Sequence, residues 1–339
     1  MTTVGTGELL YEPVENWHQL PDDIVLVEAI GVATNSQDNV YVFQRGGEPS
    51  ILVFDRHGQF LRGWGEGLFV RPHGIWIAAD DSLYLVDDEG HSVRRFSGDG
   101  ELLQTIGPCG KPSKTGAEGF DYRQITRGGA PFNLPTNAVT GSDDAVFAVD
   151  GYGNSRVHHF SAEGRLLASW GEPGRGPSEF RIPHGLGIDR EDRLYVADRE
   201  NSRIQIFAPD GGLLDTWSDV VRPCQVFIGQ DELVYVAELG ARAGLFPWMP
   251  PAEDDAVGGR VSIFDQSGAL LCRWGGEKNP HSAAEFYAPH DIWVDSHGSI
   301  YVAEVSVTAA RLAGLAPSSF RTLHKFSRVT TDDVQSIPR

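Results

Sequence analysis

The sequence has little cysteine and no long apolar run. Only three of its 339 residues are cysteines, Cys109, Cys224 and Cys272. Their odd number and the lack of closely spaced pairs exclude a disulfide framework and a cysteine-based zinc module. No stretch is long enough to span a bilayer, and "MTTVGTGELLYEPVENW" at the start lacks the basic and apolar parts of a signal peptide. We therefore expect a cytoplasmic protein.

Basic residues are also scarce. The chain has 28 Lys and Arg against 47 Asp and Glu, which gives a formal net charge of −19. Such a surface repels phosphate backbones and anionic lipids, so nucleic acids and membranes are excluded as partners. The expected partner is a small-molecule or short peptide-like substrate. The oligomeric state stays open.

Glycine and proline, in contrast, are abundant, with 40 and 20 residues, and the segments between turn signals are short. This composition is typical of β structure with many tight turns. One phrase recurs six times, and its second strand reads "VYVFQ", "LYLVD", "VFAVD", "LYVAD", "VYVAE" and "IYVAE". In five copies two more strands follow around a glycine-containing turn, as in "RIQIFAPDGGLLDTW". The sixth copy, "LHKFSRV", is partial.

Six four-stranded units with a period of about 40–65 residues predict an all-β fold, a six-bladed β-propeller. A solenoid is the competing repeat architecture, but only a closed ring explains why the sixth copy lacks an outer strand. A segment within residues 8–27 can supply that strand and close the ring, which also removes exposed sheet edges. We expect residues 1–339 to form a single propeller domain.

Three insertions interrupt the repeat, at residues 106–132, 239–258 and 306–321. We predict that they are loops on a face of the disc, where they can shape a binding pocket. The segment "TAARLAGLA" in the third is expected to be a short helix. The innermost strands are expected to begin near Gly31, Gly74, Asn137, Gly185, Gln225 and Asp291.

A Pro-His pair precedes every second inner strand and supplies His73, His184 and His290. The same place in the intervening blades is taken by Ile30, Thr136 and Cys224. Alternate blades of a six-bladed ring lie about 120° apart, so the three imidazoles should converge on the central channel.

Three converging histidines are the ligand set of a catalytic metal site, most often zinc, with one position left for water or substrate. A single histidine before a strand is more often a hydrogen-bonded turn residue, but the shared phase of these three favours the metal site. The remaining histidines that we considered are interpreted as turn or outer-strand surface residues: His91, His158, His159 and His281. The acids that end the second strands are interpreted as parts of the repeat: Asp87, Asp150, Asp198, Glu238 and Glu304.

Several words of the sequence are more specific than a propeller repeat. They are "FQRG" (43–46), "NLPTNAV" (133–139), "VDGYGNSR" (149–156), "VADRENSRIQ" (196–205) and the three Pro-His motifs. With these words the chain resembles the lyase domain of the peptidyl-α-hydroxyglycine α-amidating lyase family, a six-bladed propeller with NHL-type repeats, over roughly residues 25–305. The resemblance implies a zinc-dependent carbon–nitrogen lyase that cleaves an N-acyl-α-hydroxyglycine, a carbinolamide, to an amide and glyoxylate.

The resemblance also implies residue roles at the zinc centre. His73, His184 and His290 would hold the ion, and Tyr152 of "DGYGNSR" would be the catalytic base. Without the resemblance, a tyrosine in this glycine-flanked turn could equally serve only in packing.

Further implied roles concern the substrate and a second ion. Arg45 and Arg199 would face the substrate, although either could instead pair with surface acids. Asp291 would hold a structural calcium ion together with main-chain carbonyls at about Val32 and Ile75, or would cap a turn.

The chain departs from the family pattern at Ala288, where the family has methionine, and at Gly153, where a disulfide partner is missing. The resemblance therefore supports the metal site more strongly than it supports a peptide substrate. A smaller carbinolamide is an alternative substrate. A metal-dependent hydrolase or lactonase is the alternative enzyme, and a version built on calcium would use oxygen ligands such as Asp198 and Asn137. A non-enzymatic NHL-propeller binding module is the third alternative, and it would need no convergent histidines.

Overall fold

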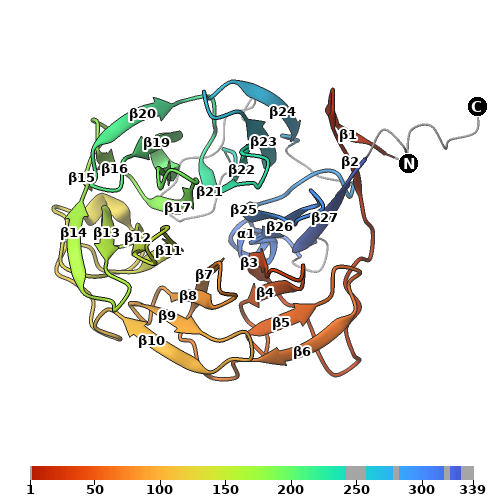
Figure 1. Cartoon of the computed structure of the whole chain (residues 1–339), viewed down its shortest axis with the longest axis horizontal. Helices are drawn as coiled ribbons and strands as arrows, with labels where there is room; N and C mark the ends of the chain where they lie inside the picture. The colour runs from red at the N-terminus through yellow and green to blue at the C-terminus, as the bar shows by residue number, and fades with distance from the viewer. Residues whose placement is uncertain (1, 242–256, 278–281, 317–320, 330–339) are drawn as a thin grey trace, which may run out of the picture.

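The computed structural model describes residues 2–241, 257–277, 282–316 and 321–329 (Figure 1). In this part of the chain, six antiparallel sheets stand in a ring around a central axis, as the repeat predicts. The protein is a six-bladed β-propeller. A small parallel pair, β15 (Glu172–Pro173) with β16 (Glu179–Phe180), lies outside the six sheets.

Each blade runs from an inner strand at the axis to an outer strand at the rim. The inner strands are β3 (Ala29–Thr34), β7 (Pro72–Ile77), β11 (Pro135–Thr140), β17 (Pro183–Ile188), β21 (Pro223–Ile228) and β25 (Pro289–Val294). The second strands are β4 (Val40–Gln44), β8 (Leu83–Asp87), β12 (Val146–Asp150), β18 (Leu194–Asp198), β22 (Val234–Glu238) and β26 (Ile300–Glu304). The third strands are β5 (Ile51–Phe54), β9 (Ser92–Phe96), β13 (Arg156–Phe160), β19 (Arg203–Phe207), β23 (Arg260–Phe264) and β27 (Leu323–Arg328). The outer strands are β6 (Phe60–Trp64), β10 (Leu102–Ile106), β14 (Leu166–Trp170), β20 (Leu213–Trp217), β24 (Leu270–Gly275) and β2 (Leu9–Pro13).

The second strands form the centre of the apolar core. All five residues of each second strand are buried, from "VYVFQ" to "IYVAE". A strand that packs against neighbouring blades on both faces needs a continuous apolar run instead of an alternating one. The outer strands lie at the rim next to solvent, and adjacent leucines at the start of β14, Leu166 and Leu167, are both exposed.

The ring closes through the N-terminal segment, as predicted. Strand β2 pairs antiparallel with β27, with Tyr11 opposite Arg328, and β1 (Val4–Thr6) pairs with β2. The fully buried Tyr11 ring stacks on Trp274 of the preceding blade at 5.6 Å between centroids. The two ends of the repeat array are thereby held in one sheet.

The inner strands begin two residues earlier than expected, and the first residue is a proline in five of them and Ala29 in β3. At that position the missing N–H of proline removes no ladder hydrogen bond. Each Pro-His histidine is consequently the second residue of its strand. A register shift follows the first residue in all six inner strands.

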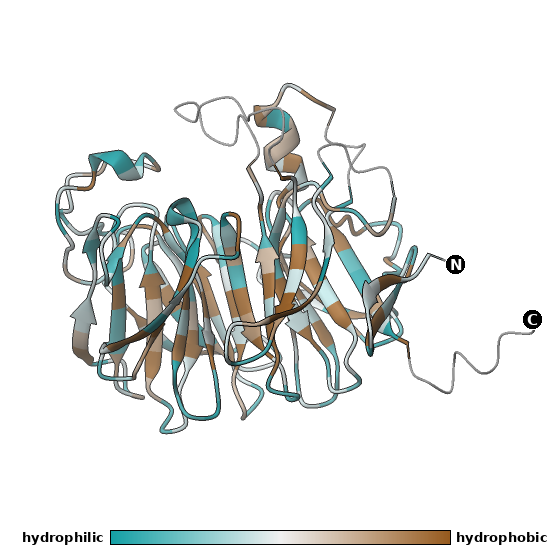
Figure 2. Ribbon diagram, turned by 90° about the horizontal axis from the view of Figure 1, so that it is seen from above, coloured by the Kyte–Doolittle hydropathy of each residue, from teal (hydrophilic) through white to brown (hydrophobic). Residues whose placement is uncertain are grey.

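The insertions lie on the face of the disc where the inner strands begin, since each connects either an outer to an inner strand or a second to a third strand. Figure 2 shows α1 (Ser306–Leu312) and the segment around η1 (Tyr122–Gln124) projecting beyond this face. The expected helix is thus present, although it ends at Leu312. Residues 242–256 of the second insertion lie outside the described residues. Within the described chain, no helix has the length and apolar character needed to cross a membrane.

Candidate metal centre

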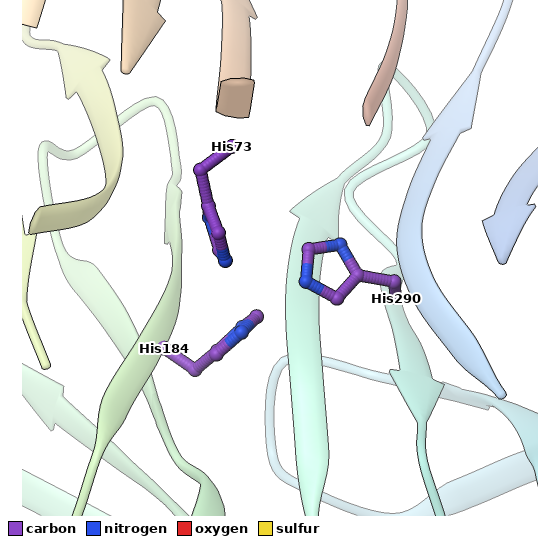
Figure 3. Close-up of side chains that lie close together, drawn as sticks. All are labelled: His73, His184 and His290. Atoms are coloured by element: carbon purple, nitrogen blue, oxygen red, sulfur yellow. The ribbon is translucent and has the colours of Figure 1, made fainter. Parts of the chain in front are cut away.

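The three Pro-His histidines meet at the axis. They come from β7, β17 and β25 and point toward one another (Figure 3). Their ring centroids lie 4.7–4.9 Å apart, and one nitrogen of each lies within 4.8 Å of the others. Across the described ranges, no other three His, Cys, Asp or Glu side chains come together in this way. The rings are buried, with 1–5% exposure.

The blades without a histidine on the inner strand orient these rings. Each Nδ1 lies within hydrogen-bond distance of a main-chain carbonyl on such an inner strand: His73 with Thr136 at 2.7 Å, His184 with Cys224 at 2.9 Å, and His290 with Ile30 at 2.7 Å. A carbonyl oxygen can only accept, so Nδ1 carries the proton and donates it. The Nε2 atoms keep their lone pairs, which is the tautomer that a metal ligand needs.

Burial keeps the three imidazoles neutral. It lowers the pKa of His73, His184 and His290, and nearby guanidinium groups act in the same direction. For His290 burial, followed by the charge of Arg45, lowers the pKa to about 3. A neutral imidazole is the form that binds a metal ion.

The donor set fits a histidine-preferring divalent ion such as zinc. Nε2 of His290 is buried and has no hydrogen-bond partner among the described residues. Nε2 of His73 and of His184 lie 3.1 Å and 2.9 Å from the Tyr152 hydroxyl. An ion would compete with that hydroxyl for Nε2 of His73 and of His184. Without an ion, the buried Nε2 of His290 has no partner among the described residues, which costs free energy.

Tyr152 lies just after the second strand of its blade, at a position that borders the metal centre. Its N–H donates to the carbonyl of Leu134 at 3.4 Å, just before the inner strand. The residues that make the same main-chain bond in the other blades are Arg45, Asp88, Arg199, Leu239 and Val305. Tyr152 comes one residue late because Gly151 intervenes. A Cβ on Gly151 would lie 2.2 Å from the carbonyl oxygen of Pro183, so only glycine fits.

Both predicted arginines lie at this rim. Arg199 is 2% exposed, its guanidinium carbon lies 5.4 Å from the centre of the Tyr152 ring, and its Nε contacts Glu200 at 2.9 Å. Burial opposes the charge of Arg199, but Tyr152 and Glu200 outweigh it and raise the pKa. Arg45 makes an ion contact with Glu28 at 3.7 Å, and burial followed by the charge of Arg71 lowers its pKa.

Two further arginines at the rim were missed by the sequence reasoning. Arg71 pairs with buried Asp88 and lies over the Phe120 ring at 4.6 Å, and Arg222 contacts Glu200 at 2.7 Å. Both residues stand two positions before an inner-strand residue at the histidine level, in "RPHG" and "RPCQ". That shared position was the available signal. Burial raises the pKa of Asp88 to about 7, against the pull of Arg71.

The predicted calcium ligand Asp291 directly follows His290 on β25. Asp291 is 4% exposed and accepts hydrogen bonds at 2.9 Å from the N–H groups of Val32 and Ile292. Burial raises its pKa to about 7. These two hydrogen bonds give Asp291 a structural role that needs no ion. Calcium binding by Asp291, Val32 and Ile75 stays a prediction.

The strand-end acids serve the fold, as expected. Each accepts at least one main-chain N–H from the segment that enters its inner strand, and Glu304, for example, accepts from Tyr287 and Ala288 at 2.7 and 2.6 Å. The corresponding bonds for Asp87, Asp150, Asp198 and Glu238 go to Val70 and Arg71, to Asn133, to Arg181 and to Val221. These bonds fix the approach to each inner strand and thus the position of the histidine on it.

The interpretation of the other histidines as turn or surface residues is wrong for His158, which is fully buried and lies 3.6 Å from Asp150. His91 lies in a turn, as expected, but is only 9% exposed and accepts a hydrogen bond from the N–H of Leu134. The position of His158 on a third strand places it between blades. His159 stacks on Phe147 at 4.3 Å, and His281 lies outside the described residues.

The first insertion is built onto the Tyr152 turn. Thr115 donates its hydroxyl to the carbonyl of Gly153, and the Asn133 amide donates to the carbonyl of Ser113 at 3.2 Å. Phe120 then packs against Tyr152, with ring centroids 5.2 Å apart. The insertion therefore covers the site on the side of blade 3.

The far end of the channel is filled by aromatic side chains. Trp76 follows His73 by three residues, and Trp293 follows His290 by three. Their rings lie 5.3 Å apart, and Phe227 packs on Trp293 at 4.4 Å. Trp76 and Trp293 belong to blades that are not neighbours, so this contact crosses the channel.

Comparison with known proteins agrees with the family resemblance that the sequence motifs indicate. The NHL repeat model matches residues 180–207, which include His184 and Arg199. NHL repeat-containing protein 3 of Mus musculus is 30% identical over 285 residues, covering 78% of this chain and 73% of that protein. The peptidylglycine alpha-amidating monooxygenase of Rattus norvegicus is 36% identical over 191 residues, covering 52% of this chain and 18% of that protein. Peptidyl-alpha-hydroxyglycine alpha-amidating lyase 1 of Drosophila melanogaster is 28% identical over 280 residues, covering 76% of this chain and 47% of that protein.

The chain thus spans less than half of that lyase and less than a fifth of that monooxygenase. Among solved structures, a streptogramin B lyase superposes with a TM-score of 0.59 at 13% identity, covering 94% of this chain and 97% of that chain. At this identity the likeness supports the fold alone. The chain belongs to the family of NHL repeat-containing propeller proteins, and amidating enzymes are among its relatives.

Proposed function

We propose that the protein is a metal-dependent carbon–nitrogen lyase that cleaves an N-acyl-α-hydroxyglycine to an amide and glyoxylate. The observation that carries the proposal is the convergence of three neutral imidazoles, two of which contact the Tyr152 hydroxyl. The amidating relatives support the same chemistry.

His73, His184 and His290 would hold a zinc ion through Nε2. When bound, zinc supplies a Lewis acid that lowers the pKa of a coordinated hydroxyl group. The fixed Nδ1–H tautomers prepare the three nitrogens for this role before the ion arrives.

Tyr152 would move the proton. As its phenolate it would accept the proton of the substrate hydroxyl, and the electron pair of that O–H bond would form the carbonyl of glyoxylate. The C–N bond would break with its electron pair passing to nitrogen, which takes up a proton from Tyr152. No water is consumed. The guanidinium of Arg199 lies over the Tyr152 ring, where its positive charge would attract the phenolate.

Arg45 would bind the substrate carboxylate. Its only ion contact in the described chain is the 3.7 Å approach to Glu28, which is longer than a hydrogen bond. Its side chain is 16% exposed and can therefore still be reached by a ligand. A planar guanidinium can hold a carboxylate through two parallel hydrogen bonds.

Two further parts of the proposal are independent of the reaction. A structural calcium ion at Asp291, with carbonyls of Val32 and Ile75, is supported by the burial of the Asp291 carboxyl. A cytoplasmic location is supported by the three free cysteines.

The test is the reaction of α-hydroxyhippurate with the zinc-loaded protein. The proposal expects equal amounts of glyoxylate and benzamide, and no oxygen from labelled water in benzamide. Formation of labelled benzoate would identify a hydrolase, the alternative enzyme. The absence of any product would contradict the lyase proposal for this class of compound.

A further inference from the structure

A polar cavity of about 480 Å³ lies on the first insertion's side of the ring. Its walls are the η1 segment, with Tyr122 and Arg123, and the entry to blade 4, with Phe180 and Arg181. The volume lies within the range of small-molecule pockets. The insertion has no counterpart in the repeat, so the cavity is an addition to the basic propeller.

The charged residues that line this cavity are positive, whereas the chain as a whole is negatively charged. Its lining residues include two arginines and no acid, although the whole chain carries a formal charge of −19. Arg123 contacts Asp121 at 2.7 Å. Arg181 is half-buried, and within the described residues its guanidinium has no hydrogen bond or ion pair. The positive lining, and Arg181 in particular, indicates an anionic ligand.

The main chain holds Arg181 in place. Its N–H donates to Asp198 at 2.7 Å, and its carbonyl accepts from the N–H of Glu200 at 3.0 Å. The side chain therefore projects from a fixed point at the start of blade 4.

The cavity shares a wall with the metal centre. Tyr122 packs against the apolar cluster of Leu134, Tyr152 and Ile182. Burial, followed by the charge of Glu200, raises the pKa of Tyr122, and Glu200 is the acid that contacts Arg199. Tyr122 thus borders the cavity and also contacts the cluster that contains Tyr152.

We infer that this cavity is a subsite for the acyl end of the substrate, and that Arg181 selects acyl groups that end in a carboxylate. The inference rests on the proposed function, which leaves the acyl group undefined. A guanidinium is suited to a carboxylate because its planar donors match the two oxygens. The preferred substrates are then N-(carboxyacyl)-α-hydroxyglycines.

The kinetic test compares N-succinyl-α-hydroxyglycine with N-butanoyl-α-hydroxyglycine, which has a methyl group in place of the carboxylate. A charge-assisted hydrogen bond predicts a kcat/KM ratio of about tenfold or more in favour of the succinyl compound. The Arg181→Met variant should bring the ratio to about one, and Arg181→Lys should restore part of it. Arg190→Met, at an arginine that is 68% exposed and paired with Glu232, is the matched control and should keep the native ratio.

Binding of compounds without the reacting hydroxyl separates this inference from the proposed reaction. Calorimetry should show tighter binding of N-succinylglycine than of N-butanoylglycine, and Arg181→Met should remove the difference. If this preference is found but no hydroxyglycine is cleaved, the reaction fails and the subsite stands. Equal binding and equal cleavage of the paired compounds, or a preference that survives in Arg181→Met, would overturn the subsite.

Discussion

At the residue scale, main-chain carbonyls of the inner strands without histidine orient the ligands of the metal centre. Ile30, Thr136 and Cys224 take the histidine place on those strands, and each carbonyl accepts a hydrogen bond from a ring. The contact uses main-chain atoms, so it does not depend on the side chain at these positions. The alternation of residue types therefore sets the ligands, and the backbone of the intervening blades sets their tautomers.

The Tyr152→Phe variant isolates the hydroxyl that contacts two of the histidines. Phenylalanine keeps the ring between Phe120 and Arg199 and loses only the proton-transfer group. We expect kcat for glyoxylate release to fall by about 10²–10⁴, with metal content and thermal stability retained. Activity within threefold of the native protein would show that Tyr152 only packs.

The pH dependence of metal retention follows from the burial of the histidines. Burial lowers their pKa, to about 3 for His290, so protonation of the ligands is postponed to acid pH. An ordinary imidazole titrates near 6.5. We expect the metal content, measured after dialysis at each pH, to stay constant from pH 8 to pH 5.5. Half-loss of the metal near pH 6.5 would instead indicate solvent-accessible ligands.

The three histidines and Tyr152 could be predicted from the sequence. The histidines recur at the same position of alternate repeats, and Tyr152 lies in a specific motif. Arg71 and Arg222 were missed, although both precede the proline of an inner strand. The phase shows which blade an arginine belongs to. It does not show that the side chain turns inward to a buried acid, since that acid comes from a different segment.

At the element scale, the repeated strands and the insertions differ in what the sequence reveals. The apolar runs and strand-end acids define the blades, with inner-strand starts displaced by two residues. The first insertion resembles no other part of the chain, so nothing in its sequence indicates that Phe120 packs on Tyr152. Contacts of this kind depend on the three-dimensional path of the insertion over the propeller.

The Phe120→Ala variant tests the role of this insertion. An aromatic pair contributes about 0.5–1.5 kcal/mol beyond its buried area. Loss of the pair with Tyr152 should lower kcat about 3- to 10-fold while the zinc content is unchanged. Lys111→Ala, at an exposed position of the same insertion, is the control and should have native kinetics. Native kinetics in both variants would mean that the insertion does not position Tyr152.

At the scale of the whole molecule, the metal centre depends on closure of the ring, because its ligands come from blades 2, 4 and 6. Blade 6 is completed by β2 from the other end of the chain. The partial sixth copy predicted this closure, and the paired registers locate it at Tyr11–Pro13.

Tyr11→Ala should weaken this closure. The side chain is fully buried, stacks on Trp274 and accepts a hydrogen bond from Arg328 at 2.8 Å. Truncation of a buried aromatic residue costs about 3–5 kcal/mol. The denaturation midpoint should fall accordingly, whereas Glu12→Ala on the same strand should have a small effect. Equal midpoints for Tyr11→Ala and the native protein would contradict closure through β2.

The most direct test of the central claim is the metal content of purified protein, measured for the native chain and for His184→Ala. His297→Ala, at an exposed histidine away from the inner strands, is the control. The account predicts about one zinc ion per chain in the native protein and in His297→Ala, and loss of that ion in His184→Ala. A native protein that binds no transition metal, or a His184→Ala variant that binds as much as the native chain, would contradict it.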